Sequence, residues 1–155
     1  MDSSVHISVQ NYDFDLAQEQ ANLLAQNKNI GAVVAFTGLC RDESGRLNAL
    51  ELEHYPGMAE AQIEKIALSA KERFSLDAVR IIHRFGIIKP GENIVLVLTA
   101  SRHRNAAFEA ASFLMDYMKT NAPFWKKEHL KSGATGDWVL SRASDDQAQK
   151  RWEEE

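Results

Sequence analysis

The run Ile94-Val95-Leu96-Val97-Leu98 contains no polar residue, and it constrains the fold more than any other segment. A strand with this composition is apolar on both faces, because successive side chains point to opposite sides of a sheet. Strands that are apolar on both faces lie in the interior of a sheet. We therefore expect residues 93–99 to form a central strand that other elements cover.

Several further strands are predicted around this one. Residues 78–85 form the preceding strand, and the short polar turn Lys89-Pro90-Gly91-Glu92 indicates that it pairs with 93–99 as an antiparallel hairpin. The β-branched run from Gly31 to Gly38, bounded by glycines, predicts a second buried strand. Shorter strands are expected at residues 6–9, 47–54 and 138–140.

Three helices are expected between these strands. Asp15 and Gln18 have the form of a capping box that opens a helix ending near Asn27. The second and third helices, over 59–74 and 103–121, each carry an apolar stripe with the periodicity of a helix that lies on a sheet. In the third helix the stripe consists of Ala107, Ala110, Ala111, Leu114 and Met118, and Pro123 ends the helix. The charged C-terminal segment is a further candidate for a helix.

The chain is expected to form one domain, spanning residues 1–155, of the α+β class. Its 155 residues, 45% of them hydrophobic, suffice for one core and not for two ordinary domains. A net charge of -4 argues against a general nucleic-acid binder or a polybasic membrane-surface protein. The sequence contains a single cysteine, and it shows neither a signal-peptide pattern nor a long apolar segment. These features favour a soluble protein of the cytoplasm.

The charge is unevenly distributed along the chain. Residues 101–131 contain six Lys or Arg against three Asp or Glu, a local excess of +3, so that the remainder sums to -7. A small electropositive region within an acidic protein fits a site for a small anion better than it fits a nucleic-acid stripe.

Arg102-His103-Arg104 marks one candidate anion site, because it follows the central strand and opens a helix. Free backbone N–H groups and the helix dipole favour an anion there, and the cationic side chains add charge-assisted contacts. The alternative is a solvated turn with a chance cluster of charges. Cations at a helix N-terminus interact unfavourably with the helix dipole. Because this costs stability, their presence slightly favours a functional interpretation.

Lys119 and Lys126 mark a second candidate site, on either side of Pro123-Phe124-Trp125. A lysine beside bulky aromatic residues can be partly desolvated, which lowers its pKa and suits it to acid, base or nucleophilic chemistry. The alternatives are that Lys119 only complements the helix dipole and that the Pro-Phe-Trp corner fills the core.

The two candidate sites cannot meet within one chain. Arg104 and Lys119 are 15 residues apart, which corresponds to about 22 Å along a straight helix. Either the chain has two sites, or a second subunit supplies the N-terminal end of this helix to one composite site. We expect the latter, a homodimer with composite sites.

Gly38-Leu39-Cys40-Arg41 leaves a predicted strand as a tight loop, where Arg41 could hold a phosphate in bidentate fashion. Cys40 could be an activated thiol, but a lone cysteine at a strand end is more often a packed apolar residue. His54 and His83 lie in strand patterns and favour structural roles. We find no convincing spacing for a metal site.

Five blocks of the sequence stand out, in order, between Gly31 and Glu128, and the longest of them runs from Met115 to Glu128. The others are Gly31-Ala-Val-Val-Ala-Phe-Thr-Gly-Leu-Cys-Arg41, Leu52-Glu-His-Tyr-Pro-Gly-Met-Ala-Glu60, His83-Arg-Phe-Gly-Ile-Ile-Lys-Pro-Gly-Glu92 and Ser101-Arg-His-Arg-Asn-Ala-Ala-Phe108. Together these blocks resemble the large, catalytic subunit of molybdopterin synthase, and the resemblance runs from about residue 5 to Trp152.

This resemblance implies a sulfurtransferase of molybdenum-cofactor biosynthesis. The family installs two sulfurs in cyclic pyranopterin monophosphate and so forms the dithiolene of molybdopterin. A small ubiquitin-like partner delivers the sulfur as a thiocarboxylate on its C-terminal Gly-Gly, so the chain itself needs no cofactor, metal or catalytic cysteine. The resemblance also implies an α/β-hammerhead fold with additional antiparallel β structure, and a heterotetramer built on a central homodimer of large subunits.

The resemblance assigns roles to individual residues. Lys119 and Lys126 correspond to the catalytic lysines of the family. The substrate-anion pocket corresponds to Arg41, His103, Arg104 and Arg142, of which the last three would come from the neighbouring subunit. Leu39, Cys40, Lys127 and Glu128 would line the pocket through backbone or secondary contacts.

Two competing functions are open at this point. One is a noncatalytic dimeric module that binds a phosphorylated ligand or a Gly-Gly peptide tail without turnover. The other is a lysine-dependent Schiff-base enzyme, which borohydride trapping with a carbonyl substrate would reveal.

Overall fold

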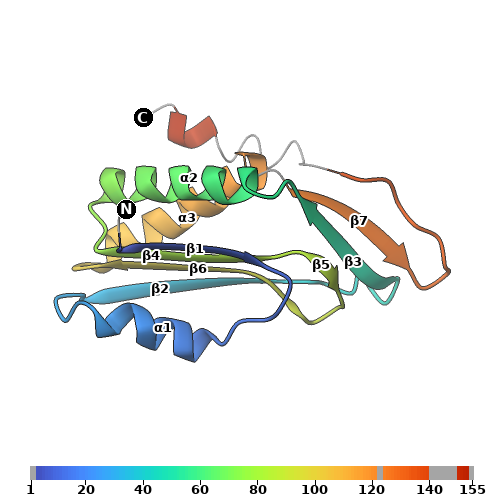
Figure 1. Cartoon of the computed structure of the whole chain (residues 1–155), viewed down its shortest axis with the longest axis horizontal. Coiled ribbons are helices and arrows are strands. Elements are labelled where there is room, and N and C mark those ends of the chain that lie inside the picture. Colours follow the sequence, from blue (N-terminus) through green and yellow to red (C-terminus); the bar gives the residue numbers. More distant parts are fainter. Residues whose placement is uncertain (1–2, 122–123, 140–149, 154–155) are drawn as a thin grey trace.

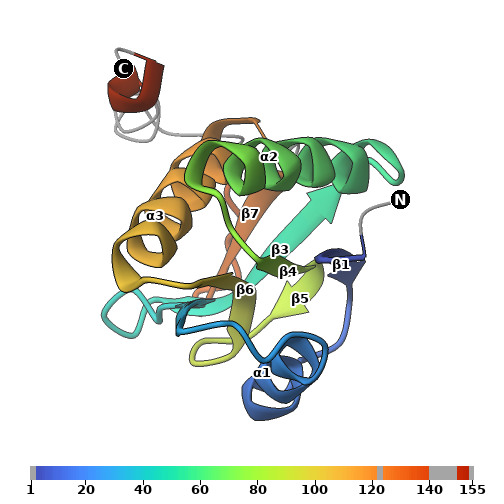
Figure 2. The ribbon, with the colours of Figure 1, turned by 90° about the vertical axis from the view of Figure 1, so that its left-hand side faces the viewer.

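The computed structural model describes residues 3–121, 124–139 and 150–153. Its core is a four-stranded sheet in the order β1-β4-β6-β2, built from β1 (Val5–Gln10), β4 (Ala78–Arg84), β6 (Asn93–Ser101) and β2 (Ala32–Leu39). β1 pairs with β4 in parallel, and the other pairs are antiparallel. Helices α2 (Met58–Phe74) and α3 (Arg104–Asn121) cover one face of this sheet, and α1 (Leu16–Ala25) covers the other (Figures 1 and 2). The α+β class is confirmed.

The central position of β6 is also confirmed, because it pairs with β4 on one side and β2 on the other. Val95 and Val97 point into the core cluster beneath α2 and α3, whereas Leu96 and Leu98 point into the cluster beneath α1. Both faces of β6 are therefore buried, as its apolar composition predicts.

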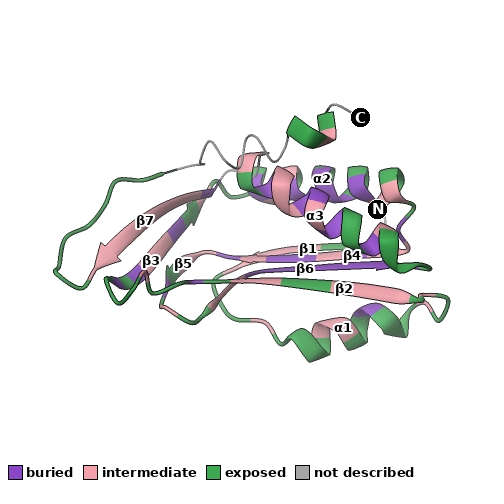
Figure 3. Ribbon diagram, turned by 180° about the vertical axis from the view of Figure 1, so that it is seen from behind, coloured by how far each residue is buried: buried purple, intermediate pink, exposed green. Residues whose placement is uncertain are grey.

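β2 is an edge strand, and the prediction that it is buried was wrong. Its residues are half-buried or exposed, and Phe36 is 40% exposed. Figure 3 shows this contrast between β2 and the buried β6. A β-branched run is compatible with either location, because β propensity reports how well side chains fit a pleated surface and not whether both edges are paired.

A second, three-stranded antiparallel sheet has the order β5-β3-β7 and extends beyond the first (Figure 1). It consists of β5 (Gly86–Ile88), the expected β3 (Leu47–His54) and β7 (Phe124–Leu130). Neither β5 nor β7 was predicted as a strand. The chain passes from β4 into β5 at Gly86, whose φ of 92° is a conformation that side chains disfavour.

The expected strand at 138–140 is reduced to one isolated bridge. Val139 and Lys126 exchange backbone hydrogen bonds of 2.8 and 2.9 Å, and Thr135 forms a similar bridge with His129. No longer ladder forms within residues 124–139, and Leu140 lies outside the described residues.

The three predicted helices are confirmed. The side chain of Asp15 caps α1 by accepting a hydrogen bond of 3.1 Å from the backbone N–H of Gln18. α2 buries the expected apolar stripe. All five residues of the predicted stripe on α3 are buried, and they face α2 and the sheet.

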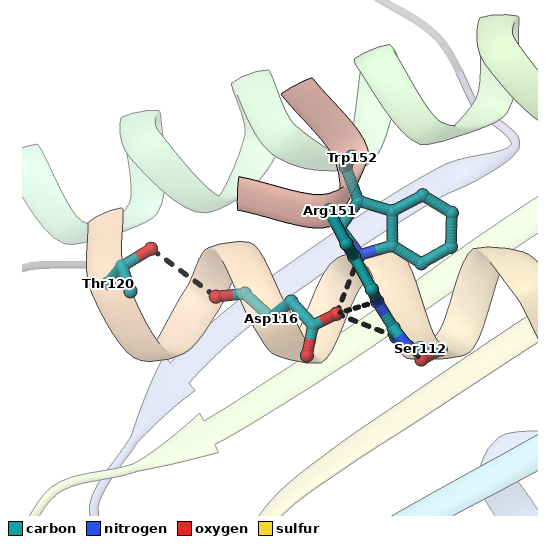
Figure 4. A network of polar contacts seen from close by, with 5 residues as sticks. All are labelled: Ser112, Asp116, Thr120, Arg151 and Trp152. Atoms are coloured by element: carbon teal, nitrogen blue, oxygen red, sulfur yellow. Dashed lines mark hydrogen bonds and ion pairs between the residues drawn. The ribbon is translucent and has the colours of Figure 1, made fainter. Parts of the chain in front are cut away.

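A helical turn at residues 150–153 docks on α3 (Figure 4). The carboxylate of Asp116 accepts hydrogen bonds from Arg151 at 2.8 Å and from the indole N–H of Trp152 at 2.6 Å. The Trp152 ring packs edge-on against Phe74 and Phe113, with centroid distances of 5.9 and 5.5 Å. These contacts hold the C-terminal turn against the outer face of the helical layer.

None of the helices in the described part of the chain is long and apolar enough to cross a membrane.

Candidate functional site

α3 separates the two predicted clusters of cations. Arg104 is its first residue, and Lys119 lies in its last turn. The helix is continuous between them, so about 22 Å separate the two positions along its axis. The expectation that one chain cannot bring Arg104 and Lys119 to the same small ligand is confirmed.

The C-terminal end of α3 leads directly to β7 and brings the two lysine positions to the same end of the molecule. Lys119 is exposed, and Lys126 is half-buried on β7. Phe124 and Lys126 share one face of β7, because alternate residues of a strand point the same way. On the adjacent strand β3 their register partners are His54 and Leu52.

An aromatic cluster lies beside the lysines. The ring of His83, from β4, stacks on Phe124 with a centroid distance of 3.7 Å and an interplanar angle of 17°. His54 also belongs to this cluster, with its ring centroid 4.4 Å from that of Phe85 and 6.0 Å from that of Phe124. Burial, with a smaller contribution from the nearby charges of Lys119 and His54, lowers the pKa of His83 to about 4, although the hydrogen bond to the Arg84 carbonyl acts in the opposite direction. His83 is therefore neutral at pH 7.

Lys127 and Glu128 lie on opposite faces of β7. Lys127 points away from the face of Lys126 and places its ammonium 5.4 Å from the ring centre of Trp138. Glu128 shares the face of Lys126, and its carbonyl accepts a hydrogen bond of 2.9 Å from the N–H of Gly136. Of this pair, Glu128 is the better placed to act with Lys126.

Leu39, Cys40 and Arg41 lie where β2 ends, which is the end of the sheet nearest the lysines. Leu39 is 52% exposed. Cys40 is buried in a cluster with Leu47, Leu52 and Ile88, and burial raises the pKa of its thiol. Arg41 is exposed and forms an ion pair of 3.0 Å with Glu43. The interpretation of Cys40 as a packed apolar residue agrees with this position, and only its backbone is left to line a pocket.

We expect Cys40→Ser to retain most of the turnover of the wild type. The substitution keeps the backbone and removes the thiol, while the new hydroxyl enters an apolar cluster at a cost of about 1–3 kcal/mol in the free energy of unfolding. Urea denaturation measures the loss of stability, and steady-state assays measure turnover. A folded variant without activity would instead revive a catalytic role for the thiol.

The second cluster of cations lines an open hollow at the opposite end of α3. Arg102, His103 and Arg104 are all exposed and surround it together with Gly31, Ala32 and Asn105. The hydroxyl of Ser101 donates a hydrogen bond to the carbonyl of His103, and the N–H of Gly31 donates one of 2.9 Å to the carbonyl of Ser101. These bonds hold the cationic turn against the start of β2.

Gly31 is required for this close approach. A Cβ added at Gly31 would lie 2.2 Å from the carbonyl oxygen of Arg102, a backbone atom that cannot move aside without shifting the turn. We expect Gly31→Ala to lower the free energy of unfolding by about 1–3 kcal/mol, as overpacking does. Chemical denaturation measures the effect, with Gly136→Ala as the matched control, because a Cβ there would lie 3.9 Å from its nearest neighbours. Equal stabilities of the two variants would contradict the steric argument.

Arg142 lies outside the described residues, so its predicted role stays a prediction. Within the described residues, no group of three or more His, Cys, Asp and Glu side chains could hold a metal ion. The sequence reasoning missed the stack of His83 on Phe124, and no local signal could have revealed it, because β4 and β7 are distant in the chain.

The two ends of α3 offer complementary chemistry. At one end, Lys119 and Lys126 lie beside the aromatic cluster that contains His83 and Phe124, and lysine side chains can transfer protons and stabilise developing negative charge. At the other end, a cationic turn at a helix N-terminus can bind an anion such as phosphate.

Comparisons with known proteins all indicate the same family. The family model described as "MoaE protein" matches residues 9–121. The molybdopterin synthase catalytic subunit of Brucella melitensis biotype 1 is 64% identical over 148 residues, which cover 96% of this chain and 91% of that protein. The corresponding subunit of Rhizobium meliloti is 59% identical over 152 residues and covers 98% of both chains.

A solved structure shares the fold as well as the sequence. The molybdopterin biosynthesis MoaE protein from Burkholderia ambifaria matches with a TM-score of 0.84 and 47% identity, covering 96% of this chain and 98% of that one. The matched family model, the relatives at nearly full length and the shared fold lead to one conclusion: this chain belongs to the MoaE family.

Proposed function

We propose that this chain is the catalytic subunit of molybdopterin synthase. In this role it transfers sulfur from the C-terminal thiocarboxylate of a small ubiquitin-like subunit to cyclic pyranopterin monophosphate, and it forms the dithiolene of molybdopterin. The observation that carries the proposal is the pair Lys119 and Lys126, which the α3–β7 junction brings to one end of the molecule in a member of this family.

The residue types suit this chemistry. Attack by a thiocarboxylate sulfur, with loss of the glycyl carboxylate, requires proton transfers and stabilisation of developing oxyanions. Lys119, which is exposed, is the better candidate to contact the carbonyl at the end of the partner's tail. Lys126 is half-buried and suits substrate orientation or proton transfer. The cyclic phosphate requires fixed cations, for which Arg41, His103 and Arg104 are the candidates.

A homodimer would unite the two halves of the site. β2 is an edge strand of eight residues, so its two ends are about 23 Å apart, close to the span between Arg104 and Lys119. Two-fold antiparallel pairing of β2 with β2 of a second chain would set the Leu39 end of one strand beside the Ala32 end of the other. The cationic turn of one subunit would then face Arg41 of its neighbour.

The exposed apolar residues at this edge support the same dimer. Phe36 shares the α3 side of the sheet with its register partner Val97, and it is 40% exposed. Phe108, near the start of α3, is 61% exposed. Large apolar side chains beside an unpaired strand edge favour association with another chain. In the resulting heterotetramer, one small subunit would bind at each outer end of the central dimer.

One reconstitution tests the proposed function. The purified chain is mixed with a thiocarboxylated small subunit and cyclic pyranopterin monophosphate, and the dithiolene product is measured. We expect product only when all three components are present, with a small subunit ending in an ordinary carboxylate as the negative control. Tight binding of the tail and the pyranopterin without any product would instead favour the noncatalytic module.

A further inference from the structure

No role assigned so far explains the stack of His83 on Phe124 at the proposed site. It joins the two sheets, because His83 belongs to β4 of the first sheet and Phe124 begins β7 of the second. It also lies where α3 ends and β7 begins, between the backbone segments that carry Lys119 and Lys126. A shift of Phe124 would therefore change the position of Lys126 relative to Lys119.

The hydrogen bond of His83 determines which tautomer its ring adopts. The Nδ1 atom lies 2.8 Å from the carbonyl oxygen of Arg84, and a carbonyl can only accept. Nδ1 therefore carries the proton, and in the neutral ring Nε2 carries a lone pair. This bond fixes the orientation of the ring, so that its flat face is presented to Phe124.

The surroundings of His83 keep the ring uncharged. Lys119 approaches from α3 and His54 from β3, and both groups disfavour a second positive charge at this point. His54 has a carboxylate neighbour of its own, Glu60 of α2, at 3.7 Å. A protonated His83 would have no such partner among the groups that act on it, and it would repel the ammonium of Lys119.

We infer that neutral His83 is a positioning residue of the reaction: through its stack on Phe124 it holds Lys119 and Lys126 in their working arrangement. This inference rests on the proposed function. The ring acts through Phe124 and does not itself touch substrate. Its effect should therefore appear in kcat and not in KM, because the anion-binding residues belong to other elements.

His83→Ala and His83→Phe separate the stack from other roles of the residue. We expect His83→Ala, which removes the ring, to lower kcat by about tenfold to a hundredfold with KM nearly unchanged, because misplacement of catalytic groups by about 1 Å has effects of this size. His83→Phe keeps an aromatic ring over Phe124, and we expect it to restore kcat to within about threefold of the wild type. His129→Ala is the matched control, because His129 pairs with Glu51 at 2.9 Å, away from this stack.

The pH profile of kcat supplies a readout that a purely structural residue would not move. As the pH falls from 7 toward 4, the wild type acquires a positive charge on His83 and loses kcat, whereas His83→Phe has no group there to protonate. We therefore expect the acid limb of His83→Phe to lie at lower pH than that of the wild type. Circular dichroism at each pH confirms that both proteins stay folded over the range compared.

Each outcome of these assays decides a question. Wild-type protein that makes no dithiolene would contradict the proposed function itself. If the wild type is active, two results would overturn only the inference about His83. One is a His83→Ala variant as active as the wild type, and the other is an acid limb of the kcat profile that is the same in the wild type and in His83→Phe. If His83→Ala fails to fold, the comparison of wild type with His83→Phe still decides.

Discussion

Lys119→Ala should abolish dithiolene formation, with a loss of turnover of about a thousandfold or more. The ammonium is lost from the end of α3, where the proposed reaction needs a group that stabilises negative charge at the carbonyl of the partner's tail. Removal of one such group from a preorganised site costs about 10²–10³ in kcat, and loss of proton transfer adds to this. Single-turnover assays with the thiocarboxylated small subunit measure the effect.

The fold and the partner interaction should survive this substitution. Lys119 is exposed, so its truncation leaves no cavity and no buried polar group. Thermal denaturation and binding of the small subunit should match the wild type, and Lys28→Ala, an exposed lysine in the loop after α1, is the control for loss of a surface charge. Full turnover by Lys119→Ala would remove this residue from the mechanism.

Two inactive variants should restore activity to each other. If Lys119 of one subunit meets Arg104 of the other, a heterodimer of Lys119→Ala and Arg104→Ala contains one site with both residues intact and one site with neither. Co-expression with two different tags, followed by tandem purification, isolates this heterodimer. We expect about half of the wild-type turnover per dimer, because one of two symmetry-related sites is intact.

The matched control pairs two defects within the same half of the site. A heterodimer of Lys119→Ala and Lys126→Ala has one defect in each of its sites, because the α3–β7 junction carries both residues in one chain. It should stay inactive. Recovery of turnover in this control, or no recovery in the heterodimer of Lys119→Ala and Arg104→Ala, would show that the site is not shared between subunits as proposed. A monomer that is fully active at micromolar concentration would show the same.

The elements with strong local periodicity were predictable from the sequence. β6 is apolar at every position, and the stripe of α3 repeats with the helical period, so each pattern has one good structural solution. Asp15 predicted the start of α1, because the helix cap forms between residues that are close in the chain. The opposed positions of Arg104 and Lys119 followed from helix geometry alone.

The second sheet was only partly predictable. The segment Phe124–Leu130 mixes aromatic and charged residues without clear alternation, and it becomes β7 because β3 offers it an edge to pair with. β5 has three residues, too few to show a period. A bulge between Leu47 and Ala49 shifts the register of β3, so that Leu47 and Leu52 enter the same cluster although they differ in parity.

The candidate site was also only partly predictable from the sequence. The sequence by itself determined which residues carry the charge and how far α3 separates them, and the family resemblance implied that a partner supplies the sulfur. Only the tertiary structure decided that β2 lies at the edge of its sheet, that Cys40 is buried and that His83 stacks on Phe124. The physical reason is that charge and helical spacing are properties of neighbouring residues, whereas strand edges, burial and ring contacts arise when distant segments pack.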